Sequence, residues 1–563
     1  MQFTTIAQSF LQISKNYQTQ NFLSNRLNNQ WNTYSVQEFC HKTKALTTAL
    51  TNLGIKKGDY VGIMSNSNPY WLMFDFACAI IGAVSVPIFA NISTKNLKYE
   101  IETTGLKTIF INKQTRWDIV HDIVEPMVDN IITRQIDAES DKIIKLEKLL
   151  ETEYDEKRIE NLASKVTPDD LLTIIFTSGT TGNPKGVCLS HGNLVSQIHD
   201  TRKCFYNDDG SHQVILSYLP LAHIFERMVM HFYLSCGFEI YFCDAIENLS
   251  KIIKDVRPTM MTTVPRLLEK IYGKISEKTA AATGLKGKLA KAAFARANNK
   301  DIEASKGLQD IIYNKLVYKK YREATGGRVK YMVSGGAALA PDLAQFFTNI
   351  GILILQGYGL SEASPVISSN TPLANRLGSS GKKFDSVEVK ITDEGELITR
   401  GPNVMQGYYK NQEATDEVIK DGWLYTGDMA KIDDDGFIFI TGRIKELFKT
   451  STGKYISPIP IEQKLFKHDY VDMAMIVAEG RKYACAVIFP TEEAANADDL
   501  DTQIEEHIKA VNKTTAKWER IVGHVIANEP PSIEDGTLTP SMKLVRKEIE
   551  AKYKKQIDGL YKR

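Results

Sequence analysis

The residues with the clearest chemical potential form one run of ten, in which hydroxyls and glycines are interleaved and a lysine comes near the end: Thr177-Ser178-Gly179-Thr180-Thr181-Gly182-Asn183-Pro184-Lys185-Gly186. Glycine lets backbone N–H groups converge on an anion, while hydroxyls add donors and lysine adds charge. A polyphosphate needs this combination of groups. A surface loop of small polar residues is the other interpretation, and the regular order of the ten residues disfavours it.

The segments around this run predict how it is held. Residues 171–176 are apolar and β-branched, as in a buried strand, and residues 187–189 predict a second short strand. Residues 190–193 are capping-type, so a helix is expected from about Leu194. The common nucleotide-binding motifs do not fit. No Gly-Lys pair precedes Ser or Thr, and the Gly357-Tyr358-Gly359 turn lacks the third glycine of a dinucleotide fingerprint.

Length and composition exclude several classes of protein. A chain of 563 residues is expected to form two or more domains, and 43% hydrophobic with 24% charged residues is ordinary for a soluble protein. The net charge of +1 gives no overall attraction to nucleic acid. The seven cysteines lack metal-type spacing and the N-terminus lacks the features of a signal peptide, which together indicate the cytoplasm. The longest apolar run, residues 76–90, is shorter than the about 20 residues of a membrane span.

The order of expected elements predicts an α/β fold. Short apolar strands alternate with helical segments between about residues 60 and 359, which indicates parallel strands with crossover helices. From Val387 the pattern becomes all-β, and short strands and two helices follow it. We therefore predict a large N-terminal domain of α/β sheets plus a β-rich subdomain, residues 1–442, and a small α+β C-terminal domain, residues 443–563.

Further motifs with polar groups and glycines lie in the second half of the chain. Gly335-Gly336 and Gln356-Gly357-Tyr358-Gly359-Leu360-Ser361-Glu362 each follow an expected strand, where open α/β sheets bind their ligands. Three more motifs are Tyr425-Thr426-Gly427-Asp428, Gly442-Arg443 and Leu538-Thr539-Pro540-Ser541-Met542-Lys543. Out of context, Glu362 and Lys543 would be ordinary surface charges, and only the motifs around them favour a function.

In this order, the motifs resemble those of the adenylate-forming superfamily, which comprises acyl-CoA synthetases, luciferases and the adenylation domains of peptide synthetases. The resemblance covers nearly the whole chain. It implies that the run of ten residues grips the β- and γ-phosphates of ATP and that Asp428 and Arg443 bind the ribose. The residues that it places around the nucleotide are Thr177, Ser178, Gly179, Thr180, Thr181, Gly182, Lys185, Gly335, Gly336, Gln356, Gly357, Tyr358, Ser361, Asp428, Arg443, Lys445, Lys449 and Lys543.

The resemblance also implies catalytic roles. Glu362 is expected to bind Mg²⁺, with Thr177 as a second protein ligand. Lys543 is expected to bridge the substrate carboxylate and the α-phosphate, while Lys185 offsets phosphate charge. The C-terminal domain of this superfamily is mobile, and Lys445 lies at its hinge.

Three segments narrow the resemblance to the long-chain fatty acyl-CoA synthetases: residues 218–227, 333–339 and 454–458. This subgroup implies that a fatty acid is converted to acyl-AMP with release of pyrophosphate and is then transferred to CoA, with ATP, Mg²⁺ and CoA required. His223 in the first segment is expected near the carboxylate. By chemistry alone a buried, hydrogen-bonded histidine is the simpler interpretation, because adenylation needs no proton transfer.

Two other functions stay open. A fatty acyl-AMP ligase would load a carrier protein instead of CoA, and a non-catalytic lipid- or nucleotide-binding protein would keep the same motifs. The basic segment of residues 280–322 motivates the second function and also a peripheral contact with the inner face of a membrane. A solvated helical face is the alternative for that segment. Chain-length preference and oligomeric state, monomer or homodimer, are not encoded in any pattern of the sequence.

Overall fold

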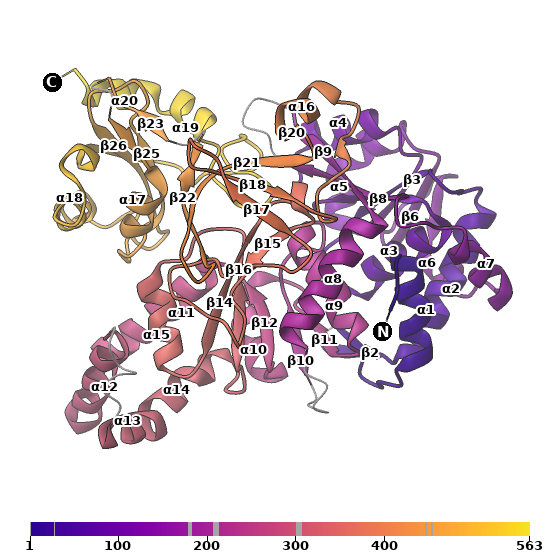
Figure 1. Ribbon diagram of the computed structural model, residues 1–563, viewed down its shortest axis with the longest axis horizontal. Helices are drawn as coiled ribbons and strands as arrows, with labels where there is room; N and C mark the ends of the chain where they lie inside the picture. The colour runs from indigo at the N-terminus through magenta and orange to yellow at the C-terminus, as the bar shows by residue number, and fades with distance from the viewer. Residues whose placement is uncertain are drawn as a thin grey trace. The chain divides into compact units, whose positions relative to one another are not determined.

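The computed structural model describes residues 2–27, 29–177, 183–206, 213–299, 307–444, 447–451 and 454–562. The chain divides into two compact units (Figure 1). Unit 1 comprises residues 1–390, 398–425 and 432–439, and unit 2 comprises residues 391–397, 426–431 and 440–563. The predicted boundary at residues 442/443 stays a prediction. Each unit is described by itself, and the division runs through the β-rich part of the chain, with β17 (Glu388–Ile391), β18 (Glu396–Arg400), β20 (Ile419–Lys420), β21 (Trp423–Ile432) and β22 (Ile438–Arg443).

One large sheet of unit 1 has the strand order β19-β9-β8-β4-β3-β5-β6-β7. Its strands pair in parallel from β8 to β7, whereas β9 is antiparallel to β8 and β19 is antiparallel to β9. Parallel neighbours need crossover connections, and helices supply them here. The bounds are β3 (Tyr60–Met64), β4 (Val84–Ile88), β5 (Thr108–Lys113), β6 (Asn130–Gln135), β7 (Ile143–Lys145), β8 (Leu171–Thr177), β9 (Lys185–Ser190), β19 (Gly407–Tyr408), α2 (Val36–Asn52), α3 (Pro69–Ile81), α4 (Thr94–Thr104), α5 (Gln114–Val124), α6 (Leu146–Leu149), α7 (Glu156–Ser164) and α16 (Gln412–Val418).

The other large sheet of unit 1 has the order β16-β15-β14-β13-β12-β10-β11-β1-β2. Strands β14, β13, β12, β10, β11 and β1 pair in parallel, so their carboxyl ends meet along one edge. The bounds are β1 (Leu23–Leu27), β2 (Gln30–Tyr34), β10 (Val214–Ser217), β11 (Glu239–Phe242), β12 (Met260–Thr263), β13 (Tyr331–Ser334), β14 (Leu353–Gly359), β15 (Val366–Ser369), β16 (Lys382–Lys383), α1 (Ile6–Asn16), α8 (His191–Phe205), α9 (Ile224–Ser235), α10 (Leu249–Val256), α11 (Pro265–Ala281), α12 (Gly284–Ala297), α13 (Leu308–Tyr313), α14 (Lys319–Arg322) and α15 (Pro341–Asn349).

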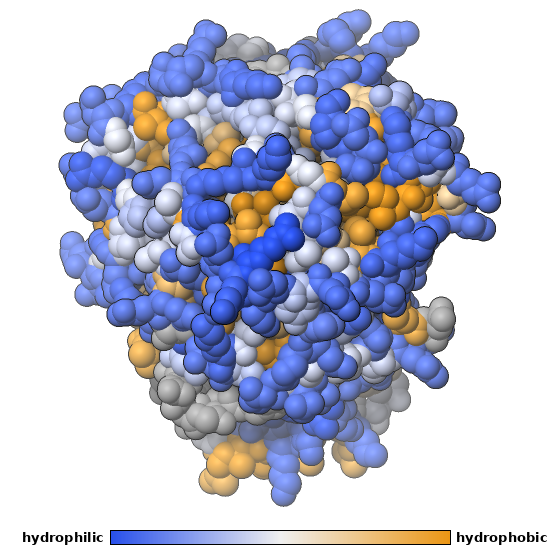
Figure 2. All heavy atoms as spheres, turned by 90° about the vertical axis from the view of Figure 1, so that its right-hand side faces the viewer, coloured by the Kyte–Doolittle hydropathy of each residue, from blue (hydrophilic) through white to orange (hydrophobic). Residues whose placement is uncertain are grey.

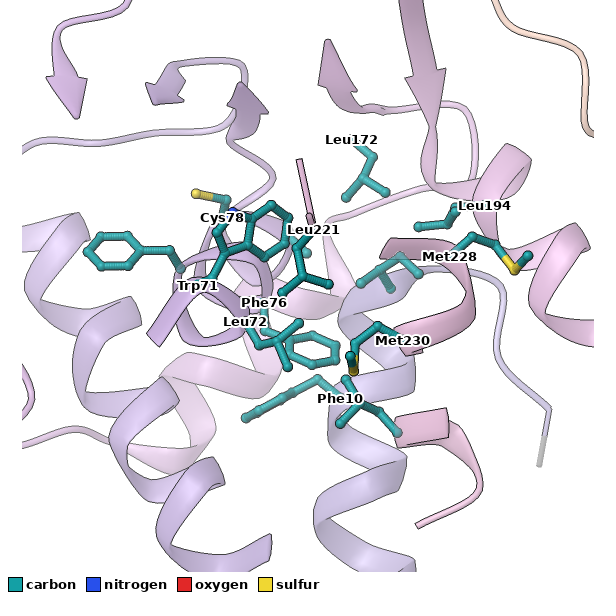
Figure 3. Packing of buried hydrophobic residues seen from close by; sticks show 14 of the residues in the cluster. Phe10, Trp71, Leu72, Phe76, Cys78, Leu172, Leu194, Leu221, Met228 and Met230 are labelled. Atoms are coloured by element: carbon teal, nitrogen blue, oxygen red, sulfur yellow. The ribbon is translucent and has the colours of Figure 1, made fainter. Parts of the chain in front are cut away.

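The core of unit 1 is built where helices α1, α3, α8 and α9 pack together (Figure 3). Helix α3 is buried along its whole length, as expected for a helix that is apolar on all sides. Phe10 of α1, Phe76 of α3 and Met230 of α9 are each 0% exposed. Full burial of one such side chain stabilises a fold by about 1.5–3 kcal/mol. The cluster also contains Leu172 and Ile175, so it holds these helices against β8.

Inside this core lies a fully buried ionic network centred on Asp75 of α3 and Arg227 of α9, whose side chains are 0% exposed. The Arg227 Nε donates to Asp75 Oδ2 at 3.0 Å, and His231 Nε2 lies 2.9 Å from the same oxygen. Arg227 also donates to Thr173 Oγ1 on β8 at 2.7 Å and to Ser85 Oγ on β4 at 2.8 Å. Burial alone would raise the pKa of Asp75, but Arg227 and His231 hold it below its usual range. The network therefore ties two helices to the strand that leads to the phosphate loop.

Unit 2 contains a sheet of order β25-β26-β27 packed against helices, and a short ribbon of β23 and β24. Strands β25 and β26 pair antiparallel, and β26 and β27 pair in parallel. The alternation of short strands and helices in this part of the chain agrees with the α+β prediction. The bounds are β23 (Phe448–Lys449), β24 (Tyr455–Ile456), β25 (Val471–Val477), β26 (Ala484–Pro490), β27 (Ile521–Ile526), α17 (Pro458–Leu465), α18 (Leu500–Asn512), α19 (Arg546–Lys552) and α20 (Lys554–Leu560).

The predicted fold class, α/β with a large N-terminal and a small C-terminal part, is confirmed, and two local expectations need correction. Helix α8 begins at His191 rather than near Leu194, because Ser190 and Asn193 form a reciprocal capping box that starts the helix earlier. Strand β14 runs on through Gln356 to Gly359 instead of ending before Gln356, because Gly357, Tyr358 and Gly359 pair with β15.

Hydrophilic side chains cover most of the side of the molecule that carries α7, with hydrophobic ones gathered in a band between them (Figure 2). Within the described ranges, helices of the length and apolar character needed to cross a bilayer are absent.

Candidate active site

The phosphate loop is carried by an antiparallel hairpin of β8 and β9. Thr177, the last residue of β8, is the cross-strand partner of Lys185, the first residue of β9. The Thr177 hydroxyl donates to the Lys185 carbonyl oxygen at 3.4 Å. This pair closes the hairpin at the point where the run of glycines and hydroxyls begins and ends. The predicted residues Ser178, Gly179, Thr180, Thr181 and Gly182 lie outside the described residues.

Lys185 and Glu362 are brought together by Tyr408, a residue that the sequence analysis did not identify. The Tyr408 hydroxyl donates to Glu362 Oε1 at 2.8 Å, and the Lys185 ammonium lies 5.0 Å from the centroid of the Tyr408 ring. All three side chains are half-buried. The geometry places a cation, a phenol and a carboxylate in one cluster, which is what a site for phosphates and a metal ion requires.

Strand register explains why Tyr408 reaches Lys185. Tyr408 in β19 pairs with Val187 in β9, and Lys185 precedes Val187 by two residues, so all three side chains lie on one face of the sheet. The backbone of Glu362 is fixed as well, because the Met405 N–H donates to the Glu362 carbonyl oxygen at 2.9 Å. Burial, followed by the Glu362 carboxylate, raises the pKa of the Tyr408 hydroxyl, which therefore stays a proton donor.

The residues predicted around the adenine lie at the carboxyl ends of two neighbouring strands. Gln356 of β14 pairs with Ser334 of β13, which places Gly335 and Gly336 beside Gly357 and Tyr358. Gly336 has φ +79°, a conformation that side chains rarely adopt, and a Cβ at Gly335 would lie 3.1 Å from the ring of Phe225. Ser361 and Glu362 follow in a single 3₁₀ turn, η5 (Ser361–Ala363). The structure therefore brings these predicted residues to one edge of the sheet.

His223 is the N-cap of helix α9. Its Nδ1 accepts a hydrogen bond from the Phe225 N–H at 3.2 Å, and its side chain is half-buried. A neutral imidazole that accepts at Nδ1 carries its proton on Nε2. The capping role agrees with the simpler interpretation of this residue as a hydrogen-bonded histidine.

Three residues after His223, Glu226 is a buried carboxyl group that no motif predicted as a special residue. Ser217 Oγ donates to Glu226 Oε1 and Thr262 Oγ1 donates to Glu226 Oε2, both at 2.6 Å. Burial raises the pKa of Glu226 to about 7. The two partners lie on β10 and β12 and Glu226 itself on α9, so the carboxyl group stabilises the region in which these three elements meet.

In unit 2, the two residues predicted for the ribose contact each other. The Arg443 Nε donates to Asp428 Oδ1 at 2.8 Å. Asp428 is 3% exposed, whereas the Arg443 side chain is about half exposed. The pair presents a carboxylate fixed by a guanidinium, which is a strong acceptor for hydroxyl groups. Lys449 in β23 is exposed with its ammonium 5.8 Å from the Tyr455 ring centroid, and Lys445 lies outside the described residues.

Lys543, also in unit 2, lies on a tight loop and is exposed. The Thr539 N–H donates to the Lys543 carbonyl oxygen at 2.8 Å, and the Lys543 N–H donates to Thr539 Oγ1 at 3.0 Å. Met542 has φ 63°, and Leu538 and Leu544 form an isolated bridge at the base of the loop. The loop therefore presents a lysine from a rigid backbone.

The residues present fit the Mg²⁺ that the motifs imply. Mg²⁺ prefers oxygen ligands and is usually bound by one or two protein groups together with substrate phosphates. The Glu362 carboxylate, oriented by Tyr408, and the Thr177 hydroxyl at the end of β8 are oxygen donors of this kind. Among the described residues no three His, Cys, Asp or Glu side chains gather as a metal cluster, and such a cluster is not needed for a metal that arrives with ATP.

This site belongs to a known class of protein. Residues 14–409 match the AMP-binding enzyme family, and residues 446–563 match the AMP-binding enzyme C-terminal domain. The chain is therefore a member of the AMP-binding enzyme family.

Individual relatives are similar over nearly the whole chain. The long-chain-fatty-acid–CoA ligase FadD15 of Mycobacterium bovis is 30% identical in an alignment of 559 positions, which covers 94% of this chain and 92% of that protein. Long-chain-fatty-acid–CoA ligase 5 of Mus musculus is 30% identical over 94% of this chain and 84% of its own. Among solved structures, the A domain of carboxylic acid reductase from Segniliparus rugosus, in complex with AMP and a co-purified carboxylic acid, has the same fold, with a TM-score of 0.79, 20% identity and coverage of 99% and 94%.

Proposed function

We propose that this chain is a long-chain-fatty-acid–CoA ligase. It converts a fatty acid and ATP to acyl-AMP and pyrophosphate, and it then transfers the acyl group to CoA with release of AMP. Membership of the AMP-binding enzymes and 30% identity to long-chain-fatty-acid–CoA ligases over 94% of the chain support this reaction and substrate. The structural observation that carries the proposal is the cluster of Lys185, Tyr408 and Glu362 beside the hairpin of the phosphate loop.

The first step must overcome repulsion between negative charges. A carboxylate is a poor acyl donor because it would have to expel oxide, so its oxygen attacks the α-phosphorus of ATP and pyrophosphate leaves. Lys185 at the loop and Lys543 on its own loop supply positive charge, and such charges stabilise most where water is excluded. Bound Mg²⁺ would neutralise further phosphate charge. We assign its binding to Glu362 and Thr177.

The remaining groups orient the substrates. Tyr408 donates to Glu362 at 2.8 Å and so fixes the carboxylate that would hold Mg²⁺. Asp428, held by Arg443 at 2.8 Å, is assigned to the ribose hydroxyls. For His223 we propose a positioning role, in which Nε2–H donates to the fatty acid carboxylate while Nδ1 keeps its bond to the Phe225 N–H.

The second step is displacement of AMP from acyl-AMP by the thiol of CoA. The thiol provides the nucleophile, so a protein cysteine is not required. We propose that the C-terminal domain moves between the two steps, with Lys445 as the hinge residue, because Lys543 and an incoming thiol need the same face of the acyl-adenylate. The proposed domains are residues 1–442 and residues 443–563.

The experiment that tests the proposed roles separates the two half-reactions. Lys543→Ala should slow adenylation, followed as fatty-acid-dependent exchange of labelled pyrophosphate into ATP, by about 10²–10³-fold. The same variant should form thioester from supplied acyl-AMP at the wild-type rate. Lys547→Ala, an exposed lysine of the same region, is the matched control and should leave both rates unchanged. Equal loss in both half-reactions would contradict the role of Lys543.

The activity itself is tested by products. Purified protein with Mg²⁺, ATP and fatty acids of C6 to C20 should yield AMP on addition of CoA, with one range of chain lengths preferred. A stalled acyl-adenylate that requires a carrier protein would instead support a fatty acyl-AMP ligase. Formation of ADP, or an absence of ATP cleavage with every acid, would overturn the proposal.

The long-chain acid also implies where the protein works. Fatty acids of this length partition into membranes, so we propose a cytoplasmic protein with a peripheral contact at the inner face of a membrane. The exposed lysines between residues 280 and 322 support that contact.

A further inference from the structure

Helix α13, the π-turn η3 (Asn314–Tyr318) and α14 form one continuous helical segment on unit 1, and its outer face is unusually apolar. Leu308 is 82% exposed and Ile311 is 67% exposed. Ile312 and Leu316 are each about half exposed. Large apolar side chains that are exposed singly need no explanation, but four within nine residues form a patch that marks an interaction surface.

The segment is held rigidly from its other side by α12. Arg296 forms an ion pair with Asp310 at 2.9 Å, and the Tyr318 hydroxyl donates to the Ala293 carbonyl oxygen at 3.0 Å. Val317 and Tyr318 are buried against this helix. The exposed apolar residues are therefore the outward face of a packed helical pair and not of a frayed chain end. In Figure 1, α12 and α13 lie at the lower left, away from α1 and α2 of the same unit.

Lysines accompany the apolar residues on this face. Lys315, Lys319 and Lys320 are exposed on the same segment. Lys315 comes four residues after Ile311 and Lys319 comes three after Leu316, so ammonium groups lie on the face that carries the apolar side chains. Long lysine stems lie along apolar surface while the charge reaches outward. Of the two acids between residues 308 and 323, Asp310 is paired with Arg296, and Glu323 comes at the far end of the segment. The patch is thus apolar, with positive charge towards its C-terminal end.

We propose that this face, defined by Leu308, Ile311, Ile312, Leu316, Lys315, Lys319 and Lys320, docks the protein on an anionic lipid surface. Exposed apolar side chains together with lysines on one helical face suit a helix at a membrane interface, in which the apolar side chains insert and the long lysine stems extend to the headgroups. A second copy of the chain is a poorer occupant. In a two-fold contact the same patch meets itself, which would set the three lysines of one copy against those of the other.

The proposal names the surface that makes the peripheral membrane contact proposed above. Only the biological purpose of docking rests on the proposed function. Docking would place the enzyme where a long-chain acid is dissolved. Vesicle binding itself requires neither ATP nor fatty acid, so it is measured independently of catalysis.

The test is co-sedimentation of the full chain with vesicles of phosphatidylcholine alone or mixed with phosphatidylglycerol. The wild type should bind the mixed vesicles, and added salt should weaken binding. A variant with Leu308→Ser, Ile311→Ser and Leu316→Ser should bind about tenfold or more weakly, because it loses the inserted apolar groups. A variant with Lys315→Gln, Lys319→Gln and Lys320→Gln should lose about fivefold in binding for each lysine on the mixed vesicles only.

Leu373→Ser is the matched control, since Leu373 is 95% exposed elsewhere on unit 1. It should bind vesicles as the wild type does. All variants should keep the wild-type rate of AMP release with octanoate, which shows that they are folded. Wild type that ignores mixed vesicles, or a serine variant that binds them normally, would overturn the proposal. A self-associating wild type that the serine variant makes monomeric, without vesicle binding by either, would overturn it in favour of a second copy.

Discussion

Two clusters of charged side chains in unit 1 use similar groups in opposite surroundings. Asp75 and Arg227 are 0% exposed and lie deep in the core, with hydrogen bonds from Arg227 onward to β4 and β8. Lys185 and Glu362 are half-buried and meet through Tyr408 at the end of a hairpin. Both clusters join a cation to a carboxylate, but only the second is accessible to a substrate.

The difference separates two uses of charge. In the core, the Arg227 guanidinium and the Asp75 carboxylate neutralise each other. Their interaction stabilises the position of β8, because Arg227 also bonds to Thr173, four residues before Thr177. At the hairpin, the Tyr408 hydroxyl bonds to Glu362 and the Tyr408 ring contacts the Lys185 ammonium. This arrangement takes the place of a direct ion pair and keeps the charges of Lys185 and Glu362 from cancelling each other. A charge that must meet phosphate or metal has to be oriented without being neutralised.

The largest expected effect comes from breaking the core cluster. Asp75→Ala leaves Arg227 buried without its counter-charge, which costs about 3–5 kcal/mol of folding stability. Urea unfolding followed by tryptophan fluorescence measures this loss, because Trp71 lies 5.4 Å from the Arg227 guanidinium. Glu388→Ala is the control, since it removes an equally bidentate pair with Arg400 whose side chains are about half exposed. That control should cost less than about 1 kcal/mol. Similar losses in both variants would remove the distinction between the clusters.

A second change tests burial without a counter-charge. Glu226 is as buried as Asp75, but its partners are hydroxyls, and burial raises its pKa to about 7 from an ordinary value near 4.5. The folded state therefore binds a proton more tightly than the unfolded state, and wild-type stability should fall by about 3 kcal/mol as pH rises from 4.5 to 7. Glu226→Gln should lose that part of the pH dependence. Parallel profiles of urea midpoint against pH for the two proteins would show that Glu226 does not titrate in this range.

The smallest change sharpens the accessible cluster. Tyr408→Phe removes the bond to Glu362 and keeps the ring beneath Lys185, so pyrophosphate exchange should slow by about tenfold, the equivalent of one charge-assisted hydrogen bond. The Mg²⁺ concentration for half-maximal rate should rise, whereas stability should change by less than about 1 kcal/mol. Tyr409→Phe loses a 3.1 Å bond to Tyr60 next to the site and is the control. An unchanged Mg²⁺ requirement in Tyr408→Phe would mean that the tyrosine does not position Glu362.

Local pattern was enough to predict much of the fold and part of the site. The strands around the phosphate loop, the crossover helices and the strand end before Gly335 follow from short-range apolar patterns, and the structure contains them. The pairing of Thr177 with Lys185 was not predicted, because the sequence placed both residues in the loop, and the structure extends the two strands to them as an antiparallel hairpin.

Contacts between distant segments were not predictable in this way. Tyr408 lies in a strand of two residues, too short for any periodicity, and meets Glu362 across 46 positions of the chain. Asp75 and Arg227 are 152 positions apart. Asp75 stands in an otherwise apolar helix, which points to burial, but nothing in the sequence identifies Arg227 as its partner. The apolar face of α13 was also missed, since Leu308 and Ile311 have the spacing of core residues and only exposure distinguishes them.

The antiparallel register of β8 and β9 limits how this chain can change by insertion or deletion. Side chains of a strand alternate between faces, and Tyr408 is paired opposite Val187. Loss of one residue between Lys185 and Val187 would turn the lysine to the reverse of the sheet, away from the phenol, even though its neighbours in the sequence were intact. A change of length in the few residues after Lys185 would therefore cost the contact between the lysine and Tyr408.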